Sequence, residues 1–383
     1  MVKTEVRGGL TNAAYGRGGG GRVPPAQYEG APKREINMST SRTLIVEPDD
    51  GRTLVLNALT TAKKSIELTI YELSDPQIVS ALNAAQQRKV AVRVLYNWYS
   101  FPPDTQQREI MPVIQQLKAA GIQCRPAPAK FEVTHEKAFV IDGSTAIVMT
   151  FNLTSEYFSD TRDFGIVTTV PAEVAEIAAV FAADWSGKPI APSVASMVWS
   201  PDNSRTKLTS LINGAKKTLD IYCEEADDPG TLGAMVAAAK RGVKVRFIAA
   251  VLSGQGKANG NARGITYLES GHVNAVCKSF PFVAQGVQHQ MYIHAKMTLA
   301  DYGTTYAQAY IGSENFSCVS LDDNRECGII VSEPAILDRL SATFNADWAK
   351  PSVPVTPDNT PLEACLGNRA ARTAARIKAR ASA

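Results

Sequence analysis

The chain carries an internal duplication, and this repeat constrains its fold more than any other feature. Three segments of the first copy return in the same order in the second: "PDDGRT" (Pro48–Thr53) as "PDNSRT" (Pro201–Thr206), "AKKSIEL" (Ala62–Leu68) as "AKKTLDI" (Ala215–Ile221), and "RKVAVRVL" from Arg88 as "RGVKVRFI" from Arg241. All three share the offset of 153 residues that separates Pro48 from Pro201. A register held over so many positions predicts two copies of one domain.

The repeat also indicates the domain boundaries. Further along, "TRDFGIV" at Thr161 returns as "NRECGII" at Asn324 with a larger offset, so the second copy has longer loops. Each copy has the size of one ordinary domain. We expect a flexible glycine-rich leader (1–40), a first lobe (41–192), a second lobe (193–350), and a proline-containing linker with a basic tail (351–383).

Helical and strand patterns alternate within each copy. In the first, Arg52–Lys64 has helical apolar spacing, Ser65–Tyr71 is rich in strand formers, and Val90–Tyr96 is a nearly continuous apolar run. Pro76–Arg88 is a second helix with Asp75 at its N-cap. The alternation predicts an α/β fold in which each lobe has a mixed, largely parallel sheet flanked by helices. Two such lobes are expected to pack about a pseudo-twofold axis within a monomer.

Charge and hydropathy disfavour several classes of protein. The net charge is +3, but the segment from Arg369 carries five basic and no acidic residues, which leaves about −2 for the rest. This balance disfavours the strongly basic surface of a non-specific nucleic-acid binder. No apolar run is long enough to span a bilayer, and the first 38 residues lack the apolar core of a signal peptide. We therefore expect a soluble, cytoplasmic protein.

The six cysteines are expected to be reduced and mostly buried. They are Cys124, Cys223, Cys277, Cys318, Cys327 and Cys365, and no pair has the close spacing of a zinc or redox motif. Neither a metal nor a cofactor is expected.

One motif whose side chains could take part in catalysis occurs once in each copy. "THEKAFVID" and "IHAKMTLAD" share the spacing His-x-Lys-x4-Asp, and the residues are His135, Lys137 and Asp142 in the first copy and His294, Lys296 and Asp301 in the second. A histidine and a lysine two positions apart on a strand point to the same face, so both can approach one phosphate. A single match would arise by chance in some chains, whereas two matches inside an independent repeat indicate a functional site.

Each motif is followed by an asparagine and then by a second carboxylate. These residues are Asn152 and Asp163 in the first copy and Asn315 and Glu326 in the second. Gly-Ser precedes the asparagine of the second copy, with the serine at Ser313, where the first copy has Met-Thr. We therefore expect an asymmetric pocket for the phosphate oxygens.

This arrangement resembles the phospholipase D superfamily, which has a duplicated HKD motif. The resemblance covers about residues 42–350. It implies two phospholipase D-type lobes that bring both His–Lys pairs to one cleft, and cleavage of a phosphodiester through a phosphohistidine. It does not identify the substrate, because the superfamily includes phospholipases, cardiolipin and phosphatidylserine synthases, nucleases and DNA-repair phosphodiesterases.

The resemblance also implies roles for the motif residues. His135 is expected to be the nucleophile and His294 the acid and base, although the symmetry of the repeat does not distinguish them. The residues expected to hold the phosphate oxygens are Lys137, Lys296, Asn152 and Asn315.

The remaining motif residues are expected to position others. Asp163 and Glu326 would orient the imidazoles, either of their own lobe or of the opposite one. Asp142, Asp301 and Ser313 would support the motif structurally. A lysine beside each histidine disfavours a second cation, so we expect no metal site and activity that survives chelation.

Other residues are candidates for the rim of the pocket. Two aromatic clusters in loops upstream of the motifs could contact lipid chains or stack on bases, with plain loop packing as the alternative: Trp98 with Tyr99, and Phe280 with Phe282. Glu72 and Glu225 end equivalent strands, at the edge where α/β sheets bind ligands, with a solvated strand end as the alternative.

Three functions stay open from the sequence. The first is a phospholipase D-like hydrolase of a phospholipid head group, with transphosphatidylation onto alcohols as a variant and peripheral contact with a membrane surface. The second is a nuclease or nucleic-acid phosphodiesterase, which the charge distribution makes less favoured. The third is a non-catalytic module that binds a phosphate or a lipid.

Overall fold

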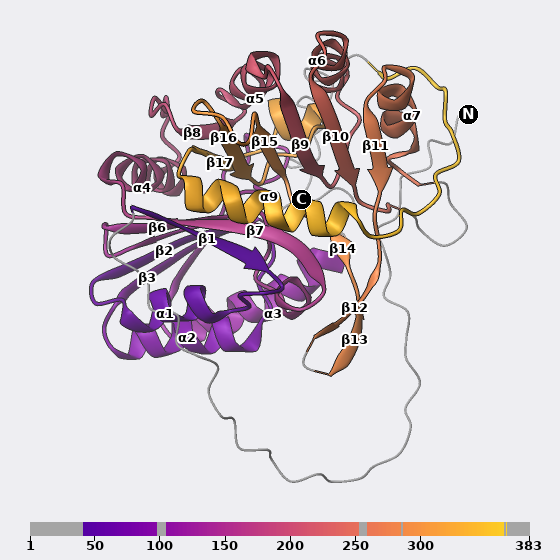
Figure 1. Cartoon of the computed structure of the whole chain (residues 1–383). Helices are drawn as coiled ribbons and strands as arrows, with labels where there is room; N and C mark the ends of the chain where they lie inside the picture. Colours follow the sequence, from indigo (N-terminus) through magenta and orange to yellow (C-terminus); the bar gives the residue numbers. More distant parts are fainter. Residues whose placement is uncertain (1–40, 98–104, 253–258, 285, 364, 366–383) are drawn as a thin grey trace, which may run out of the picture.

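The computed structural model describes residues 41–97, 105–252, 259–284, 286–363 and 365. The expected leader at 1–40 and the basic tail from 366 onward lie outside the described residues, as do Trp98 and Tyr99. Two β-sheets face each other, with helices on their outer sides and α4 and α9 beside the seam (Figure 1).

The first sheet has the strand order β1-β7-β6-β5-β2-β3-β4. Its strands are β1 (Arg42–Glu47), β2 (Ser65–Ile70), β3 (Ala91–Tyr96), β4 (Gln123–Pro126), β5 (Ala138–Ile141), β6 (Thr145–Met149) and β7 (Thr161–Thr168). The predicted mixed α/β class is confirmed. Parallel pairing joins β2, β3 and β4, because helices cross over between them, while the strands from β5 to β1 pair antiparallel.

The second sheet repeats this topology. Its order β8-β17-β16-β15-β9-β10-β11 matches that of the first sheet strand for strand. Its strands are β8 (Met197–Ser200), β9 (Thr218–Cys223), β10 (Lys244–Ala249), β11 (Asn274–Cys277), β15 (Met297–Ala300), β16 (Gln308–Gly312) and β17 (Glu326–Val331). A hairpin of β12 (Pro281–Ala284) and β13 (Val287–Gln290) projects from this lobe, and β14 (Tyr292–Ile293) follows it (Figure 1).

The helices occupy equivalent places in the two lobes. The first lobe has α1 (Thr53–Thr61), α2 (Pro76–Gln87), α3 (Thr105–Ala119), the 3-10 turn η1 (Ser155–Phe158) and α4 (Pro171–Ser186); the second has α5 (Ser204–Gly214), α6 (Pro229–Lys240), α7 (Ala262–Ser270), α8 (Cys318–Asp322) and α9 (Pro334–Trp348). The predicted N-cap of α2 is confirmed, since the Asp75 carboxylate accepts from the backbone N–H groups of Gln77 and Ile78. Asp228 caps α6 at the equivalent position.

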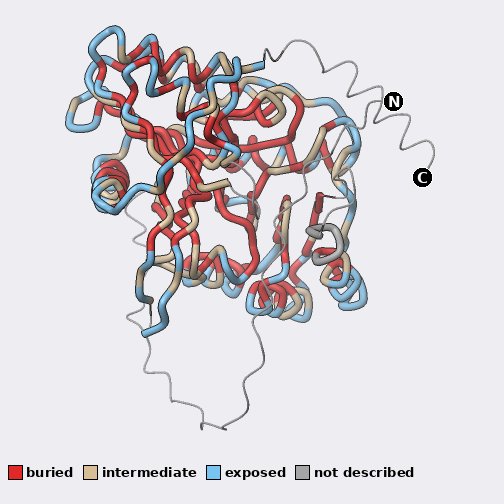
Figure 2. The backbone as a smooth tube through the Cα atoms, turned by 90° about the vertical axis from the view of Figure 1, so that its right-hand side faces the viewer, coloured by how far each residue is buried: buried red, intermediate tan, exposed pale blue. Residues whose placement is uncertain are grey.

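Three apolar cores hold these layers together. Each lobe has its own core between its sheet and its outer helices. The third core lies between the two sheets and includes side chains of α4 and α9, such as Ile177 and Phe344. Figure 2 shows the buried strands as a continuous interior with exposed residues at the turns and outer helix faces. The two copies therefore form one folded unit rather than two independent domains joined by a linker.

Strand pairing also crosses between the lobes. β14 of the second lobe pairs in parallel with β7 of the first, through Tyr292 with Thr161 and Ile293 with Arg162. The reciprocal bridge joins Thr134 of the first lobe to Arg325 of the second. Each crossing lies directly before a motif histidine, so the lobe interface positions the motifs.

The expectation that all six cysteines are reduced is wrong for two of them. Cys318 of α8 and Cys365 form a disulfide that closes a loop of 47 residues, while Cys124, Cys223, Cys277 and Cys327 are free thiols. Sequence spacing did not indicate the pair, because it is the return of segment 351–363 past α7 that brings Cys365 to α8.

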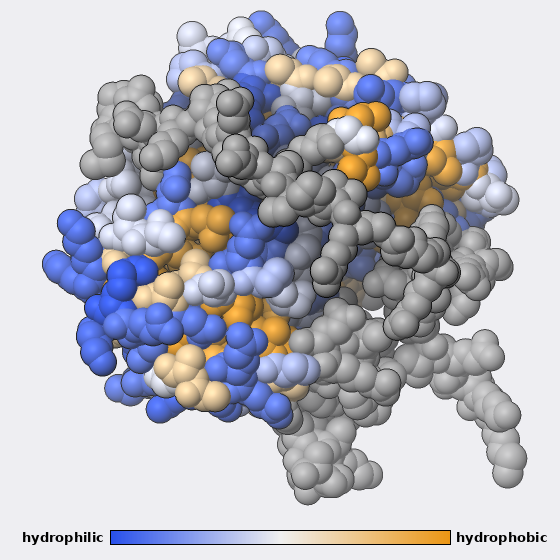
Figure 3. All heavy atoms as spheres, turned by 90° about the horizontal axis from the view of Figure 1, so that it is seen from below, coloured by the Kyte–Doolittle hydropathy of each residue, from blue (hydrophilic) through white to orange (hydrophobic). Residues whose placement is uncertain are grey.

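One face of the molecule is mainly polar. The face seen from below in Figure 3 is dominated by hydrophilic side chains, with several separate hydrophobic patches. Among the described residues, no helix combines the length and the apolar character needed to cross a membrane.

Candidate active site

Both motifs meet at one polar pocket between the lobes. Its volume is about 250 Å³, and it is lined by Tyr71, Glu72, Val133, His135, Asn152, Tyr157, Glu224, Glu225, His294, Asn315, Ser317, Val319, Ser320, Asn324 and Glu326. Residues from both repeats thus contribute to one site, as expected from the duplication.

Backbone hydrogen bonds from the opposite lobe fix each histidine. The N–H groups of His135 and Glu136 both donate to the carbonyl oxygen of Arg325, each at 2.9 Å. In the mirrored arrangement, His294 and Ala295 donate to the carbonyl oxygen of Arg162 at 3.2 and 2.9 Å. The chain therefore enters each motif strand from a contact with the other copy.

The carboxylates that orient the imidazoles also come from the opposite lobe. Nδ1 of His135 lies 2.8 Å from Oε2 of Glu326, and Nδ1 of His294 lies 2.9 Å from Oδ1 of Asp163. The sequence left open which lobe each acid serves, and the structure shows that the acids are exchanged. With Nδ1 engaged, Nε2 of His135 is left for a substrate, while Nε2 of His294 lies 3.5 Å from Oε2 of Glu224.

Both orienting carboxylates are themselves held by donors. The hydroxyl of Thr150 donates to Asp163 at 2.5 Å. Ser320 and Asn324 donate to Oε1 of Glu326 at 2.6 and 2.9 Å, which leaves Oε2 for His135. Ser313, the repeat counterpart of Thr150, instead exchanges hydrogen bonds with the backbone of Cys327. The two residues therefore differ in whether they support an orienting acid, and neither lines the pocket where the asymmetry was expected.

The two motif lysines are buried beside the histidines but have different neighbours. Each Nζ donates to the carbonyl oxygen of its own motif histidine at 2.6 Å. Lys296 is ion-paired with Glu224 at 2.7 Å, whereas Lys137 lies 5.2 Å from the ring centre of Tyr71. Glu224 and Tyr71 are equivalent positions of the repeat, so the two halves of the pocket differ in charge.

The two asparagines lie in the pocket wall beside carboxylates. Nδ2 of Asn152 donates to Glu72 at 3.0 Å. Nδ2 of Asn315 lies 3.4 Å from Glu224, and its Oδ1 accepts from the backbone N–H of Glu225 at 3.2 Å. Both amide groups therefore face the side of the pocket where the strands β2 and β9 end.

Burial and the lysine cluster set the protonation of the site. Burial, with the charge of Lys137, lowers the pKa of His135 to about 4, so this imidazole is neutral at pH 7. Burial and the nearby charge of Lys296 lower the pKa of Lys137 to about 7. Burial alone would raise the pKa of Glu326, but His135 and Lys137 hold it below its usual value. A neutral imidazole beside an ionised acid is the state that a nucleophile needs.

These shifts predict the pH dependence of kcat/KM, which reports the free enzyme. His135 acts without its proton, so activity should persist down to about pH 5, below the range of an ordinary histidine. Lys137 acts with its proton, so activity should fall as pH rises through about 7. A pH profile of kcat/KM for a soluble phosphodiester measures both limbs.

Lys137→Arg is the control for the alkaline limb. A guanidinium keeps its proton throughout the range, so the part of the fall above about pH 7 that Lys137 causes should disappear in this variant. Any limb that remains belongs to His294, the other group that acts with its proton. A limb that stays in place would assign it to another group.

The aspartate of each motif contacts the backbone and not the pocket. Asp142 has φ 55° and accepts from the backbone N–H groups of Lys63, Lys64 and Ser65 at 2.6–3.1 Å. Asp301, also at φ 55°, makes the same three bonds to the start of β9. Backbone hydrogen bonds hold the pKa of Asp142 below its usual value despite its partial burial. Neither residue lines the pocket.

We expect Asp142→Ala to lower the free energy of unfolding by about 2–4 kcal/mol. Three N–H groups lose a charged acceptor, and alanine disfavours the left-handed backbone at this position. Asp142→Asn should lose less, because asparagine tolerates φ > 0 and keeps an acceptor oxygen. Denaturant unfolding of the two variants measures the difference, and equal losses would contradict this account.

The expected rim residues are placed differently from the prediction. Phe280 is buried at 3% exposure in the core between the sheets, because β11 leads it inward. Phe282 is on β12, where its ring stacks on His289, and neither residue lines the pocket. Trp98 and Tyr99 lie outside the described residues. Glu72 and Glu225, in contrast, both lie in the pocket wall.

Sequence reasoning missed several pocket residues. Glu224 and the rings of Tyr71, Tyr157 and Tyr292 lie against the motif residues, with the ring centre of Tyr157 4.7 Å from that of His294. A comparison of the two repeats could have identified two of these residues. Tyr71 and Glu224 occupy matching positions at the ends of matching strands, and a change of residue class there marks a difference between the lobes.

One group of residues outside the pocket has the atoms of a metal site. Asp228, Cys318 and Cys365 place their ligand-type atoms within 4.8 Å of one another. The two sulfurs are joined in the disulfide, and Asp228 pairs with Arg205 and caps α6. The group therefore offers no thiolate ligands while the disulfide is formed.

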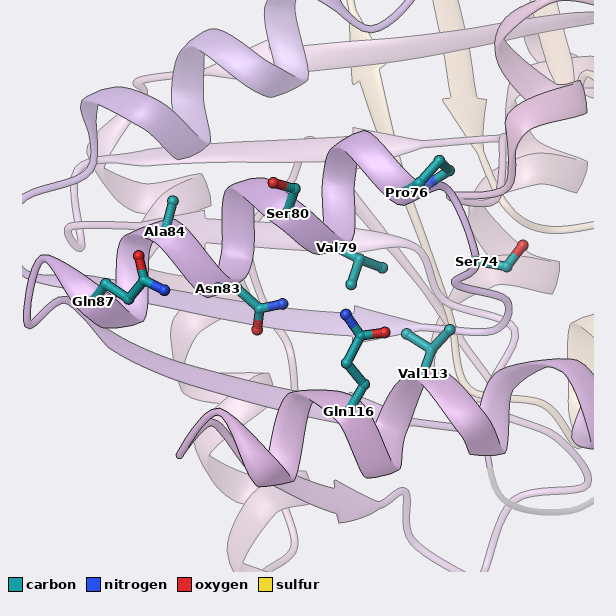
Figure 4. A pocket seen from close by; sticks show the side chains of 9 residues that line it. All are labelled: Ser74, Pro76, Val79, Ser80, Asn83, Ala84, Gln87, Val113 and Gln116. Atoms are coloured by element: carbon teal, nitrogen blue, oxygen red, sulfur yellow. The ribbon is translucent and has the colours of Figure 1, made fainter.

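A larger hollow lies away from the motifs. It has a volume of about 330 Å³ between α2 and α3, where Asn83 and Gln116 extend towards the same space (Figure 4). Its lining side chains are uncharged, and they include two serines but no histidine, lysine or carboxylate that could activate a serine as a nucleophile. The candidate active site is therefore the smaller pocket between the lobes.

Comparisons with known proteins match this arrangement. A family model described as "Cardiolipin synthase, PLD-like domain" matches residues 55–185 and 208–348, which is more than half of the chain and includes both motifs. Mitochondrial cardiolipin hydrolase of Xenopus laevis is 28% identical over 121 residues, which are 31% of this chain and 54% of that protein. The match thus spans only about half the length of that relative.

Two further relatives extend the comparison. Phospholipase D of Rickettsia bellii is 26% identical over 164 residues, which are 43% of this chain and 76% of that protein. The crystal structure of phosphatidylserine synthase from Haemophilus influenzae is 14% identical, with a TM-score of 0.60 over 88% of this chain and 94% of that one. At that identity the likeness concerns the fold alone.

Proposed function

The chain belongs to the phospholipase D-like family, and from this premise we propose that it cleaves the phosphodiester bond of a phosphoglyceride head group through a phosphohistidine on His135. The observation that carries the proposal is the pair of imidazoles, each held by a carboxylate of the opposite lobe, in one pocket. The neutral state of His135 favours it as the nucleophile.

In the first step, Nε2 of His135 attacks phosphorus while the bond to the leaving oxygen breaks. Protonated His294 donates its Nε2 proton to that oxygen, so the head group leaves as an alcohol. The ammonium groups of Lys137 and Lys296 and the amides of the two asparagines stabilise charge on the non-bridging oxygens. Glu326 stabilises the positive charge that develops on His135.

In the second step, His294 acts as a base. It takes a proton from water, the oxygen attacks phosphorus, and the N–P bond to His135 breaks to give a phosphomonoester. An alcohol in place of water gives transphosphatidylation by the same route. No step requires a metal, because protein cations supply the electrostatic stabilisation.

A lipid substrate is favoured over a nucleic acid by the charge of the pocket. Glu72 and Glu224 lie in its wall and would repel the flanking phosphates of a strand. Two curated relatives are called a cardiolipin hydrolase and a phospholipase D, which fits a phosphoglyceride. A membrane-bound substrate would require peripheral contact with the lipid surface.

We propose further that one chain suffices for turnover, since both lobes of the pocket come from it. We also propose the compartment in which the protein works. The Cys318–Cys365 disulfide favours an oxidising compartment over the cytoplasm expected from the sequence.

The test is turnover of phosphatidylcholine vesicles and of single-stranded DNA, both in EDTA, by the wild type and His135→Ala. The expected result is lipid cleavage that the variant abolishes, with DNA intact. His272→Asn is the control, because it alters an exposed histidine at φ 65° outside the pocket. DNA cleavage that His135→Ala abolishes would replace the lipid proposal with a nuclease. No turnover of either substrate would leave the binding-module alternative.

A further inference from the structure

We propose that Glu224 is an internal competitor for phosphate in the second half of the pocket. Its carboxylate holds the anion position, which disfavours doubly charged phosphomonoesters relative to singly charged diesters and promotes release of the monoester product. This inference rests on the proposed function, because it takes the motif residues to bind phosphate.

Three groups that the mechanism assigns to the substrate contact this carboxylate. Oε2 of Glu224 lies 2.7 Å from Nζ of Lys296 and 3.5 Å from Nε2 of His294. Nδ2 of Asn315 lies 3.4 Å from the same oxygen. A carboxylate oxygen thus stands where a non-bridging phosphate oxygen would meet a lysine, a histidine and an asparagine.

The position of Glu224 is fixed by further contacts. The hydroxyl of Tyr292 donates to Oε1 at 2.7 Å. Nδ2 of buried Asn261 donates to the carbonyl oxygen of Glu224 at 2.7 Å, which anchors the backbone. The side chain is only 16% exposed, so it is an integral part of the pocket wall.

In the first half of the pocket, the position equivalent to Glu224 is occupied by an uncharged residue. Tyr71, the repeat counterpart of Glu224, lays its ring against Lys137 at 5.2 Å and against His135 at 4.9 Å. A ring face attracts a cation weakly and carries no net charge. The duplicated site therefore has one lysine paired with a carboxylate and one lysine beside a neutral ring.

The difference in charge between substrate and product gives this pairing a consequence. A phosphodiester carries one negative charge, whereas a monoester has a second pKa of about 6 and approaches two negative charges at neutral pH. Either anion must displace Glu224 from Lys296, and the displaced carboxylate then repels it in a pocket of low dielectric. The repulsion is greater for the dianion, so Glu224 weakens monoester binding more than diester binding.

The test is calorimetric titration with two probes, inorganic phosphate for the dianion and diethyl phosphate for the monoanionic diester. Against the wild type, Glu224→Gln should bind inorganic phosphate about tenfold or more tighter and diethyl phosphate about threefold tighter or less. Glu225→Gln is the matched control, since it replaces a carboxyl group of the same wall that makes no ion pair with Lys296, and its gain should be smaller. Burial and the charge of Glu224 raise the pKa of Glu225 to about 7, so this carboxyl group is only partly ionised at neutral pH.

Tyr292→Phe is a second variant that keeps the charge of Glu224 and removes one bond that holds it. It should tighten inorganic phosphate in the same direction by a smaller factor, and it tests the inference if Glu224→Gln fails to fold, as judged by circular dichroism. Phosphate affinity unchanged or weakened in both variants would overturn the inference. Equal gains for the two probes would overturn the discrimination by charge.

A third outcome distinguishes failure of the role of Glu224 from failure of the proposed phosphodiesterase function. If neither the wild type nor Glu224→Gln binds either probe, the pocket is no phosphate site, and both the inference and the proposed function fail. If the wild type binds and only the effect of Glu224 is absent, the proposed function stands alone.

Discussion

Replacing Glu326 with glutamine is expected to lower kcat/KM about 10³- to 10⁴-fold, the scale seen when an acid that orients a catalytic imidazole loses its charge. Ser320 and Asn324 donate to Oε1, so the amide oxygen of the new side chain would take that place. Its NH₂ group would then face Nδ1 of His135 and donate to it. The imidazole proton would move to Nε2, where it blocks attack on phosphorus.

Asp163→Asn tests the exchange of acids between the lobes. Asp163 contacts His294, so this variant should impair the acid and base steps and not the nucleophile. A phosphodiester with a p-nitrophenolate leaving group needs little help from an acid. With it, Asp163→Asn should keep a burst of p-nitrophenol and turn over slowly, while Glu326→Gln should show no burst.

Two outcomes would contradict this assignment. A burst in Glu326→Gln with none in Asp163→Asn would mean that His294 is the nucleophile. Retention of more than about a tenth of kcat/KM by Glu326→Gln would mean that the hydrogen bond to His135 matters little. Ser320→Ala, which removes one donor to Glu326 and keeps its charge, serves as the milder comparison and should lose about tenfold or less.

Arg162→Met is expected to lower the free energy of unfolding by about 3–5 kcal/mol, because it leaves a buried charge without its partner. Arg162 of the first lobe is paired with Asp347 of the second at 2.7 Å, with side-chain exposures of 8% and 3%. The reciprocal pair joins Arg325 of the second lobe to Asp184 of the first at 2.8 Å. These pairs clamp the lobes where the Arg162 and Arg325 carbonyl groups hold the motif histidines.

The double variant Arg162→Met with Asp347→Leu is the informative control. Replacement of both charges by apolar groups should recover much of the lost stability, since removal of a buried pair costs less than breaking it. Arg339→Gln breaks a more exposed interlobe pair with Asp50 and should cost less than about 1 kcal/mol. Denaturant unfolding measures all three variants. A loss of 1 kcal/mol or less in Arg162→Met would show that the buried clamp contributes little.

The sequence carried much of the fold because its signals are local or repeated. The apolar periods at 52–96 predicted α1, β2, α2 and β3 to within a few residues at each end, and Asp75 caps α2 as expected. The constant register of the repeat predicted two lobes of one topology, which the matching strand orders confirm. The motif spacing predicted each lysine beside its histidine on one strand. In the structure the two residues lie just before β5 or β15, and each lysine Nζ donates to the backbone carbonyl oxygen of its histidine.

Tertiary structure decided everything that depends on contacts between distant segments. Glu326 meets His135 across 191 positions and Asp163 meets His294 across 131, because β14 pairs with β7 and Thr134 bridges to Arg325. The burial of Phe280 and the disulfide of Cys318 with Cys365 have the same origin. Spacing along a chain constrains only near neighbours, whereas the partner of a side chain at a lobe interface is set by how two complete sheets pack. The sequence by itself therefore determined the motif residues of the site. The packing of the two copies determined which acid contacts which histidine.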